Sequence, residues 1–235
     1  MRSTGKDCCL SNPGFIHWCG AAVLMLTQSY GYSMGLTSFD EPGMEAALLL
    51  QRYEVGFDVG DSIVESRVNR AGLVLFEPAY SAFQPGLQMG AFNINQSNNP
   101  VTAGMSLSGN YLGVMFRSLL YSHRNLGLQV EGSYTYNDAD KVASNQEVSL
   151  QWHEYMANLH VQWAYGNFYY AIGGYSQLID GEEVAYGTIT QTRESKVNER
   201  TGVHFRFDYR VDATGKVGFQ VDSGGRQGVG LIFSR

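Results

Sequence analysis

Residues 200–212, RTGVHFRFDYRVD, carry an ionisable side chain at every second position. These side chains are His204, Arg206, Asp208, Arg210 and Asp212. Alternate side chains of a β-strand point to opposite faces, so the segment predicts a strand with one apolar face and one ionisable face. Such groups can act in acid–base catalysis, bind a charged ligand or pair with each other. Their chemistry depends on what the two faces contact.

Two other groups of residues are candidates for catalysis. Ser149, His153 and Glu154 have the residue types of a hydrolase triad, but four strand residues span about 13 Å, too far for a direct hydrogen bond. Asp138 and Asp140 have the chemistry of a carboxylate-based protease, yet they fit the tip of a loop between two alternating segments. We therefore predict no catalytic residue in this chain.

Metal and phosphate sites have no clear sequence signature. The histidines at 123, 153, 160 and 204 do not have the spacing of zinc ligands. The acidic run at 180–183 lacks the ligand series of an EF-hand, and the sequence has no GxxxxGK phosphate loop. We expect neither a metal nor a cofactor.

The N-terminus has the composition of an export signal. Arg2 and Lys6 precede an apolar stretch at 15–26, and Ser29-Tyr30-Gly31 gives a small-x-small cleavage pattern. All three cysteines, Cys8, Cys9 and Cys19, lie in this segment, so the mature chain is expected to have none. The expected organisation is a signal peptide at 1–31, a periplasmic linker at 32–50 and a barrel domain at 51–235.

Composition limits the class of protein. Charged residues make up 16% of the chain and the net charge is −6, which argues against a nucleic-acid binder. After the N-terminal segment the sequence has no apolar run of 18 residues, which argues against a helical membrane protein.

Period-two alternation recurs along the rest of the chain and predicts an all-β fold of about ten antiparallel strands, with eight as an alternative. The predicted strands are 51–60, 68–77, 85–95, 104–120, 126–137, 147–164, 167–178, 200–212, 216–222 and 227–233. At 147–164 the apolar positions shift by one residue, which predicts a β-bulge near His153 and Glu154. The connections alternate between short turns and longer polar loops, the longest at 179–199.

The same alternation fits a soluble barrel with an apolar interior or a membrane barrel with an apolar exterior. The export signal and the aromatic residues of the apolar faces, including Tyr53, Tyr134, Tyr136, Tyr209, Trp152 and Trp163, favour the membrane barrel. In that case a network of charged side chains points into the lumen. Its predicted members are Arg52, Glu54, Asp58, Glu131, His204, Arg206, Asp208, Arg210 and Asp212.

The C-terminal segment RQGVGLIF resembles the β-signal by which outer-membrane proteins are recognised for assembly, on the basis of Gly228, Leu231 and Phe233. It departs from that pattern because Ser234 and Arg235 follow the terminal aromatic residue. Together with the strand layout, it makes the mature chain resemble the small monomeric outer-membrane β-barrels of Gram-negative bacteria. The resemblance implies a monomer in the bacterial outer membrane that contacts membrane lipid and lipopolysaccharide and is inserted by the barrel-assembly machinery.

The predicted function is a structural or surface-interaction role, with a lumen largely filled by side chains. A narrow pore for small solutes is one alternative. A lipid-modifying or proteolytic outer-membrane enzyme is another.

Overall fold

The computed structural model describes residues 44–60, 62–78, 82–102, 104–143 and 145–235. The predicted signal peptide and most of the predicted linker lie outside these residues. The described part forms eleven strands: β1 (Glu45–Val59), β2 (Ser62–Phe76), β3 (Phe83–Ser97), β4 (Ser106–His123), β5 (Leu126–Ala143), β6 (Gln146–Tyr165), β7 (Phe168–Gly187), β8 (Gln191–Val197), β9 (Thr201–Arg210), β10 (Lys216–Gly224) and β11 (Arg226–Ser234). Within the described chain, no helix has the length and apolar character required to traverse a bilayer.

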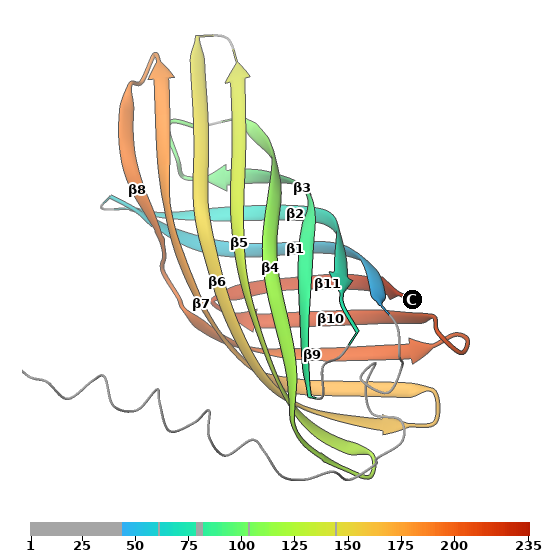
Figure 1. Ribbon diagram of the computed structural model, residues 1–235. Coiled ribbons are helices and arrows are strands. Elements are labelled where there is room, and N and C mark those ends of the chain that lie inside the picture. Colours follow the sequence, from blue (N-terminus) through green and yellow to red (C-terminus); the bar gives the residue numbers. More distant parts are fainter. Residues whose placement is uncertain (1–43, 61, 79–81, 103, 144) are drawn as a thin grey trace, which may run out of the picture. The chain divides into compact units, whose positions relative to one another are not determined.

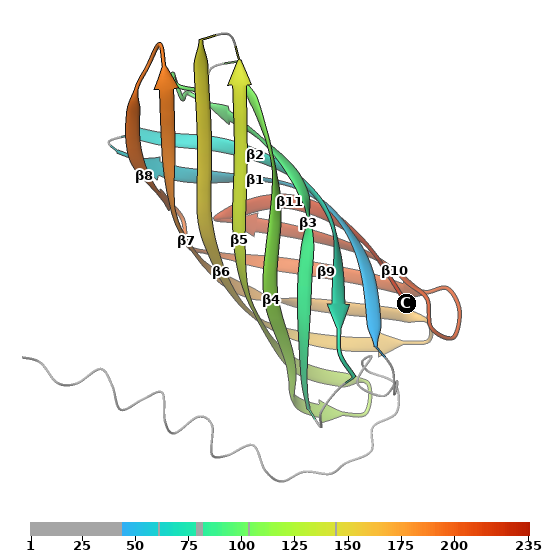
Figure 2. The same cartoon turned by 45° about the horizontal axis from the view of Figure 1, so that its top comes forward.

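The strands form a closed antiparallel barrel (Figures 1 and 2). The last strand, β11, pairs with the first, β1, from Ala47↔Ser234 to Val55↔Arg226. The ring of ten strands consists of β1–β7, β9, β10 and β11. The prediction of an all-β antiparallel barrel of about ten strands is confirmed.

The strand number changes along the barrel. The lower part of β7 pairs with β9, whereas its upper part pairs with β8, from Asp180↔Lys196 to Ala185↔Gln191. There β8 also pairs with β1 over Phe57–Val59, so the ring consists of the eight strands β1–β8. We call this part the narrow half, and the ten-stranded part, which holds the C-terminus, the wide half.

The transition between the halves is the tip of the β10–β11 hairpin. Gly224 has a φ of 102°, which a residue without a Cβ adopts readily, and the chain reverses there. The Gln177 side chain donates from Nε2 to the carbonyl oxygens of Glu199 and Gly225, both at 3.1 Å. The N–H of Gly225 donates to the carbonyl of Thr201 at 2.9 Å. These bonds satisfy backbone groups where regular pairing stops.

Two predicted boundaries are wrong. β1 begins at Glu45, so the end of the predicted linker belongs to the barrel. The predicted long loop at 179–199 is mostly the β7–β8 hairpin, and the predicted difference in loop length between the two ends is absent because β5, β6 and β7 extend into the regions read as loops. β6 and β7 each contain 20 residues.

Side chains on one face of a strand meet different surroundings in the two halves. In the narrow half the interior is an apolar core that includes Phe57, Phe92, Leu107, Leu150 and Trp152. Its outer face is polar. In the wide half the outer face is apolar and the interior is largely polar.

This inversion explains the shift in the apolar pattern of β6. Val148, Leu150 and Trp152 point inward in the narrow half, whereas Tyr155 and Leu159 point outward in the wide half. β6 pairs with β5 and β7 without interruption, so the predicted bulge near His153 and Glu154 is wrong. The register shift occurs instead in β4, between Leu119 and Tyr121.

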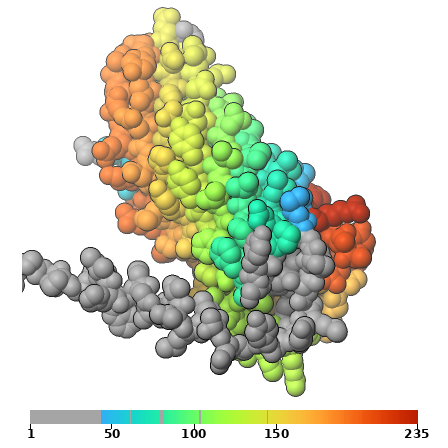
Figure 3. All heavy atoms as spheres, viewed as in Figure 1, coloured from blue at the N-terminus to red at the C-terminus, as the bar shows by residue number. Residues whose placement is uncertain are grey.

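The outer face of the wide half forms a continuous apolar belt. It includes Leu48, Leu50, Leu73, Leu87, Met89, Leu112, Val114, Phe116, Leu159, Val161, Ile172, Leu178, Val203, Phe205, Phe219, Val221, Val229, Leu231 and Phe233, all exposed. In the space-filling view, the side chains of β4–β8 form a closed outer wall (Figure 3).

Candidate functional site

The boundary between the apolar core and the polar lumen is a layer of buried charges. Glu154, on the inner face of β6, lies 3.0 Å from Arg70 (Oε2 to Nη2) and 3.3 Å from Arg226 (Oε1 to Nη1). All three side chains are at most 6% exposed. Because a buried charge requires pairing, one carboxylate between two guanidinium groups holds β2, β6 and β11 together at this level.

Neutral side chains complete the layer. Arg70 donates to Asn137 Oδ1 at 2.8 Å and Arg226 donates to Gln51 Oε1 at 3.0 Å. The Arg226 guanidinium lies 3.7 Å from the centre of the Tyr53 ring, and the Arg70 guanidinium lies 4.5 Å from that of Tyr111. Aromatic faces attract cations, so these rings support the guanidinium groups from the side of the apolar core.

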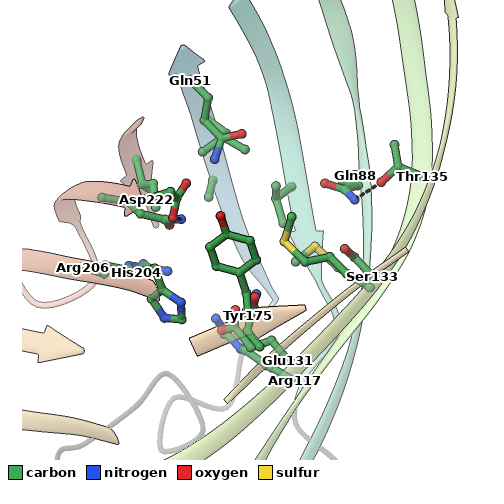
Figure 4. Close-up of a pocket in the computed structure, with 18 of the residues that line it drawn as sticks. Gln51, Gln88, Arg117, Glu131, Ser133, Thr135, Tyr175, His204, Arg206 and Asp222 are labelled. Carbon is green, nitrogen blue, oxygen red and sulfur yellow. Dashed lines mark hydrogen bonds between the residues drawn. The ribbon is translucent and has the colours of Figure 1, made fainter. Parts of the chain in front are cut away.

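Below this layer lies a cavity of about 150 Å³ inside the wide half (Figure 4). One part of its wall is apolar and includes Val74, Phe76, Met115 and Ile232. Figure 4 shows His204, Arg206 and Asp222 on one side, and Gln88, Ser133 and Thr135 on the opposite side. Gln88 Nε2 donates to Thr135 Oγ1 at 2.6 Å.

Ion pairs also line the lumen nearer the wide end. Arg206 donates from Nε to both carboxylate oxygens of Asp208, at 2.8 and 3.0 Å. Arg117 pairs with Glu45 and donates from Nε to Gln84 Oε1 at 2.7 Å. The lumen of the wide half is therefore lined by paired charges and amide side chains.

The narrow end is filled by the β3–β4 connection. Asn99 Nδ2 donates to Glu183 Oε2 at 2.7 Å, and Arg193 pairs with the same carboxylate. Val101 and Thr102 of this connection are almost fully buried. Together with the apolar core, the connection fills the interior between the charged layer and the narrow end.

Five of the charged residues predicted for the lumen lie on the inner side of the wall. Glu131, His204 and Arg206 line the cavity, and Asp208 lies beside Arg206. The Arg210 guanidinium lies 5.1 Å from the centre of the Tyr169 ring at the wide end. The His160 ring meets that of His204 edge to face at 5.2 Å.

Arg52, Glu54 and Asp58 point outward, which corrects the prediction for β1. Their apolar neighbours Tyr53 and Phe57 are buried in the narrow half, because there the apolar face of the strand meets a core instead of lipid. Trp152 is inside for the same reason.

Asp212 also lies outside the lumen, in the turn after β9. Its Oδ1 accepts hydrogen bonds from the N–H groups of Thr214 and Gly215, at 2.9 and 2.6 Å. These donors hold the pKa of Asp212 below its usual value. Its role in the structure is to shape the β9–β10 turn.

The proposed assembly residues lie on the last strand. Leu231 and Phe233 face outward in the apolar belt of β11. Gly228 pairs with Tyr53, and a Cβ at this glycine would come within 2.5 Å of the Tyr53 Cβ.

The candidate catalytic residues do not assemble into a site. Ser149 and His153 lie on the outer face of β6, whereas Glu154 points inward. The His153 ring contacts Tyr134, whose hydroxyl lies 2.8 Å from His153 Nδ1. Asp138 and Asp140 are exposed on the outer face of β5. Among the described residues no group of three His, Cys, Asp or Glu side chains is arranged to hold a metal ion.

The layer of Arg70, Glu154 and Arg226 was missed from the sequence. The signal is faint, because Glu154 is one charged residue on the face that also carries Trp152 and Met156. Arg70 lies near the start of the predicted strand 68–77 and Arg226 directly precedes the predicted strand 227–233, and in both segments the alternation is irregular. Only the barrel's closure brings the three residues together.

No protein-family model and no curated protein matches this chain. Solved structures that are similar include the outer membrane protease OmpT from Escherichia coli, with 10% identity, 83% of this chain and 95% of that chain covered, and a TM-score of 0.46. The translocator domain of the autotransporter NalP from Neisseria meningitidis has 10% identity, coverage of 82% and 88%, and a TM-score of 0.48. An outer membrane channel from Pseudomonas putida F1 has 12% identity, coverage of 83% and 96%, and a TM-score of 0.43. These proteins differ in role, so the likeness assigns no role to this chain.

Proposed function

We propose that this chain is an outer-membrane β-barrel with a structural or surface-interaction role and an interior sealed by its own side chains. The observation that carries the proposal is the apolar belt. A belt of exposed Leu, Val, Ile and Phe side chains encircles the wide half alone, and an apolar surface of this kind supports a location in a membrane.

The height of the belt supports this location. On β7 it extends from Phe168 to Leu178, which is about 33 Å along the strand. A strand tilt of 35–45° reduces this to about 25 Å, the height of the apolar band in outer-membrane barrels. Aromatic residues gather at its edges, with Trp163, Tyr170 and Tyr209 towards the wide end and Tyr134 and Tyr155 near the narrow half.

The narrow half then projects beyond the bilayer. A membrane-spanning strand needs about 9–11 residues, and β6 and β7 have 20 each. With the C-terminus on the periplasmic side, as is usual for these barrels, the narrow half faces the outside of the cell. Its polar outer surface is available for contact with other molecules.

The filled interior favours this role over a narrow pore. A solute would have to pass the charged layer and the apolar core that contains Trp152 and Phe57. We further propose that the assembly machinery recognises Leu231 and Phe233 on β11 when the barrel is inserted into the membrane.

Three measurements test the proposal. The mature chain should fractionate with the outer membrane and migrate faster on a gel before heating than after heating. In planar bilayers, the purified protein should give no steady open current, and reproducible single-channel steps would favour the pore instead. A protein recovered without detergent from the periplasmic fraction would overturn the membrane location.

A further inference from the structure

The outer surface has a hollow of about 890 Å³ where the belt meets the polar face of the narrow half. It crosses β10, β11 and β1–β5. Ala71 and Ala91 lie side by side in its floor and are paired across β2 and β3. Their side chains are smaller than that of Leu50, which pairs with Ala71 across β1 and β2.

The two walls of the hollow differ in chemistry. The wall towards the belt is apolar and includes Leu50, Phe219, Val229 and Leu231. The wall towards the narrow half is polar and includes Arg52, Asn69, Asn93, Ser108, Asn110, Asp138 and Asp140. An occupant with an apolar part in the membrane and a polar part above it fits this arrangement.

The polar wall contains a row of residues paired across neighbouring strands. Arg52 pairs with Asn69, Asn69 with Asn93, Asn93 with Ser108, and Ser108 with Asp140. Because neighbouring strands are about 4.8 Å apart, the row spans about 19 Å. It begins with a cation, continues with amide and hydroxyl groups, and ends with a carboxylate.

The groups in this row have hydrogen-bonding capacity to offer a ligand. Arg52 makes no ion pair with any other described residue. Asn69 donates from Nδ2 to Asn93 Oδ1 at 3.4 Å, and this bond does not use the amide N–H groups of Asn93. A guanidinium beside carboxamide donors is suited to a phosphate, and carboxylates accept bonds from sugar hydroxyl groups.

We propose that this hollow binds a phosphorylated saccharide lipid of the lipid A type. The phosphate lies at Arg52, the sugar hydroxyls contact Asn93 and Asp140, and the acyl chains lie along the belt below Ala71 and Ala91. A glycerophospholipid such as phosphatidylglycerol has a phosphate for Arg52 but no disaccharide to reach the other end of the row. The inference rests on the proposed outer-membrane location, which places the hollow at the headgroup level of the outer leaflet.

The test is native mass spectrometry of the purified full barrel in detergent, titrated with monophosphoryl lipid A or with phosphatidylglycerol. The barrel should bind monophosphoryl lipid A at least about tenfold more tightly than phosphatidylglycerol. Arg52→Gln should weaken lipid A binding by about tenfold, the loss expected for one charge-assisted hydrogen bond. Ala91→Leu, which fills the floor, should weaken it as well.

Arg67→Gln is the matched control, because Arg67 is exposed on the outer face of β2, lies outside the hollow and pairs with Glu54. It should leave lipid A binding unchanged. Equal binding of the two lipids, or equal binding by Arg52→Gln and the unaltered protein, would overturn the inference. Heat-modifiable migration of each variant shows that the barrel has formed, so a folded outer-membrane barrel without lipid A preference would contradict the lipid site alone.

Discussion

Trp152 and Glu154 are consecutive inward-facing residues of β6, and the interior of the barrel changes from apolar to charged between them. Trp152 packs against Phe92 with ring centres 5.1 Å apart, whereas Glu154 lies between the guanidinium groups of Arg70 and Arg226. The outer face of the same strand changes in the opposite sense, from Gln151 to Tyr155. One strand thus has a polar outer face over an apolar interior at one end, and an apolar outer face over a charged interior at the other.

The effect of an outward-facing arginine should depend on the half of the barrel. Leu159→Arg places a cation in the middle of the belt and should destabilise the folded state by about 2–4 kcal/mol. Gln151→Arg, on the same face of the same strand, lies beside water and should change stability by less than about 0.5 kcal/mol. Unfolding by guanidinium in lipid vesicles measures both, and similar losses would contradict the assigned belt.

The aromatic core should carry much of the stability of the narrow half. Trp152 is 1% exposed and packs edge to face on Phe57 and Phe92, so Trp152→Ala should cost about 3–5 kcal/mol. Trp163→Ala is the control on the outer face, where lipid can refill the space. Its loss should be clearly smaller in the same unfolding experiment, and the reverse order would argue against a packed interior.

Removal of the central carboxylate should be more costly than removal of an exposed one. Glu154→Gln leaves the buried Arg70 without its ion-pair partner and leaves Arg226 with only Asp222, at 3.9 Å, so it should destabilise the barrel by about 3–5 kcal/mol. Glu54→Gln removes the exposed pair with Arg67 and should cost less than about 1 kcal/mol. Equal stability of these two variants in denaturant titrations would mean that Glu154 is not held as described.

The directions in which the side chains of β1 point can be measured with cysteines introduced at two neighbouring positions. The predicted mature chain has no cysteine, so a single introduced thiol is the sole target of a maleimide. Asp58→Cys should react on whole cells with a membrane-impermeant maleimide, because this side chain faces outward, whereas Phe57→Cys should stay protected until unfolding. Labelling in the opposite order would restore the orientation expected from sequence.

Sequence reasoning found the strands because period-two alternation is a local property. The orientation of residues 201–210 also followed, since Phe205 and Tyr209 face outward and His204 faces the lumen, whereas Asp212 lies in the turn beyond the strand. The same rule failed for β1. Phe57 and Phe205 have equivalent surroundings in sequence, but one contacts a core and the other faces outward, and alternation alone does not distinguish these environments.

The charged layer could not be predicted for a related reason. Arg70, Glu154 and Arg226 are far apart in sequence, and they meet only because β11 closes against β1 and brings Arg226 across from β6. A single acidic residue in an alternating strand does not identify its partners. The pairing of β8 with β1 could not be predicted from the sequence either, because it forms only beyond the tip of the β10–β11 hairpin.

Because β10 and β11 end partway along the barrel, the circumference is set by eight strands in the narrow half and by ten in the wide half. A longer β10–β11 hairpin would widen the narrow half. Deletion of the hairpin would let β9 pair with β1 and would reduce the circumference of the wide half. Circumference, often treated as one integer for a whole barrel, becomes a local variable that an engineer can adjust with a single insertion.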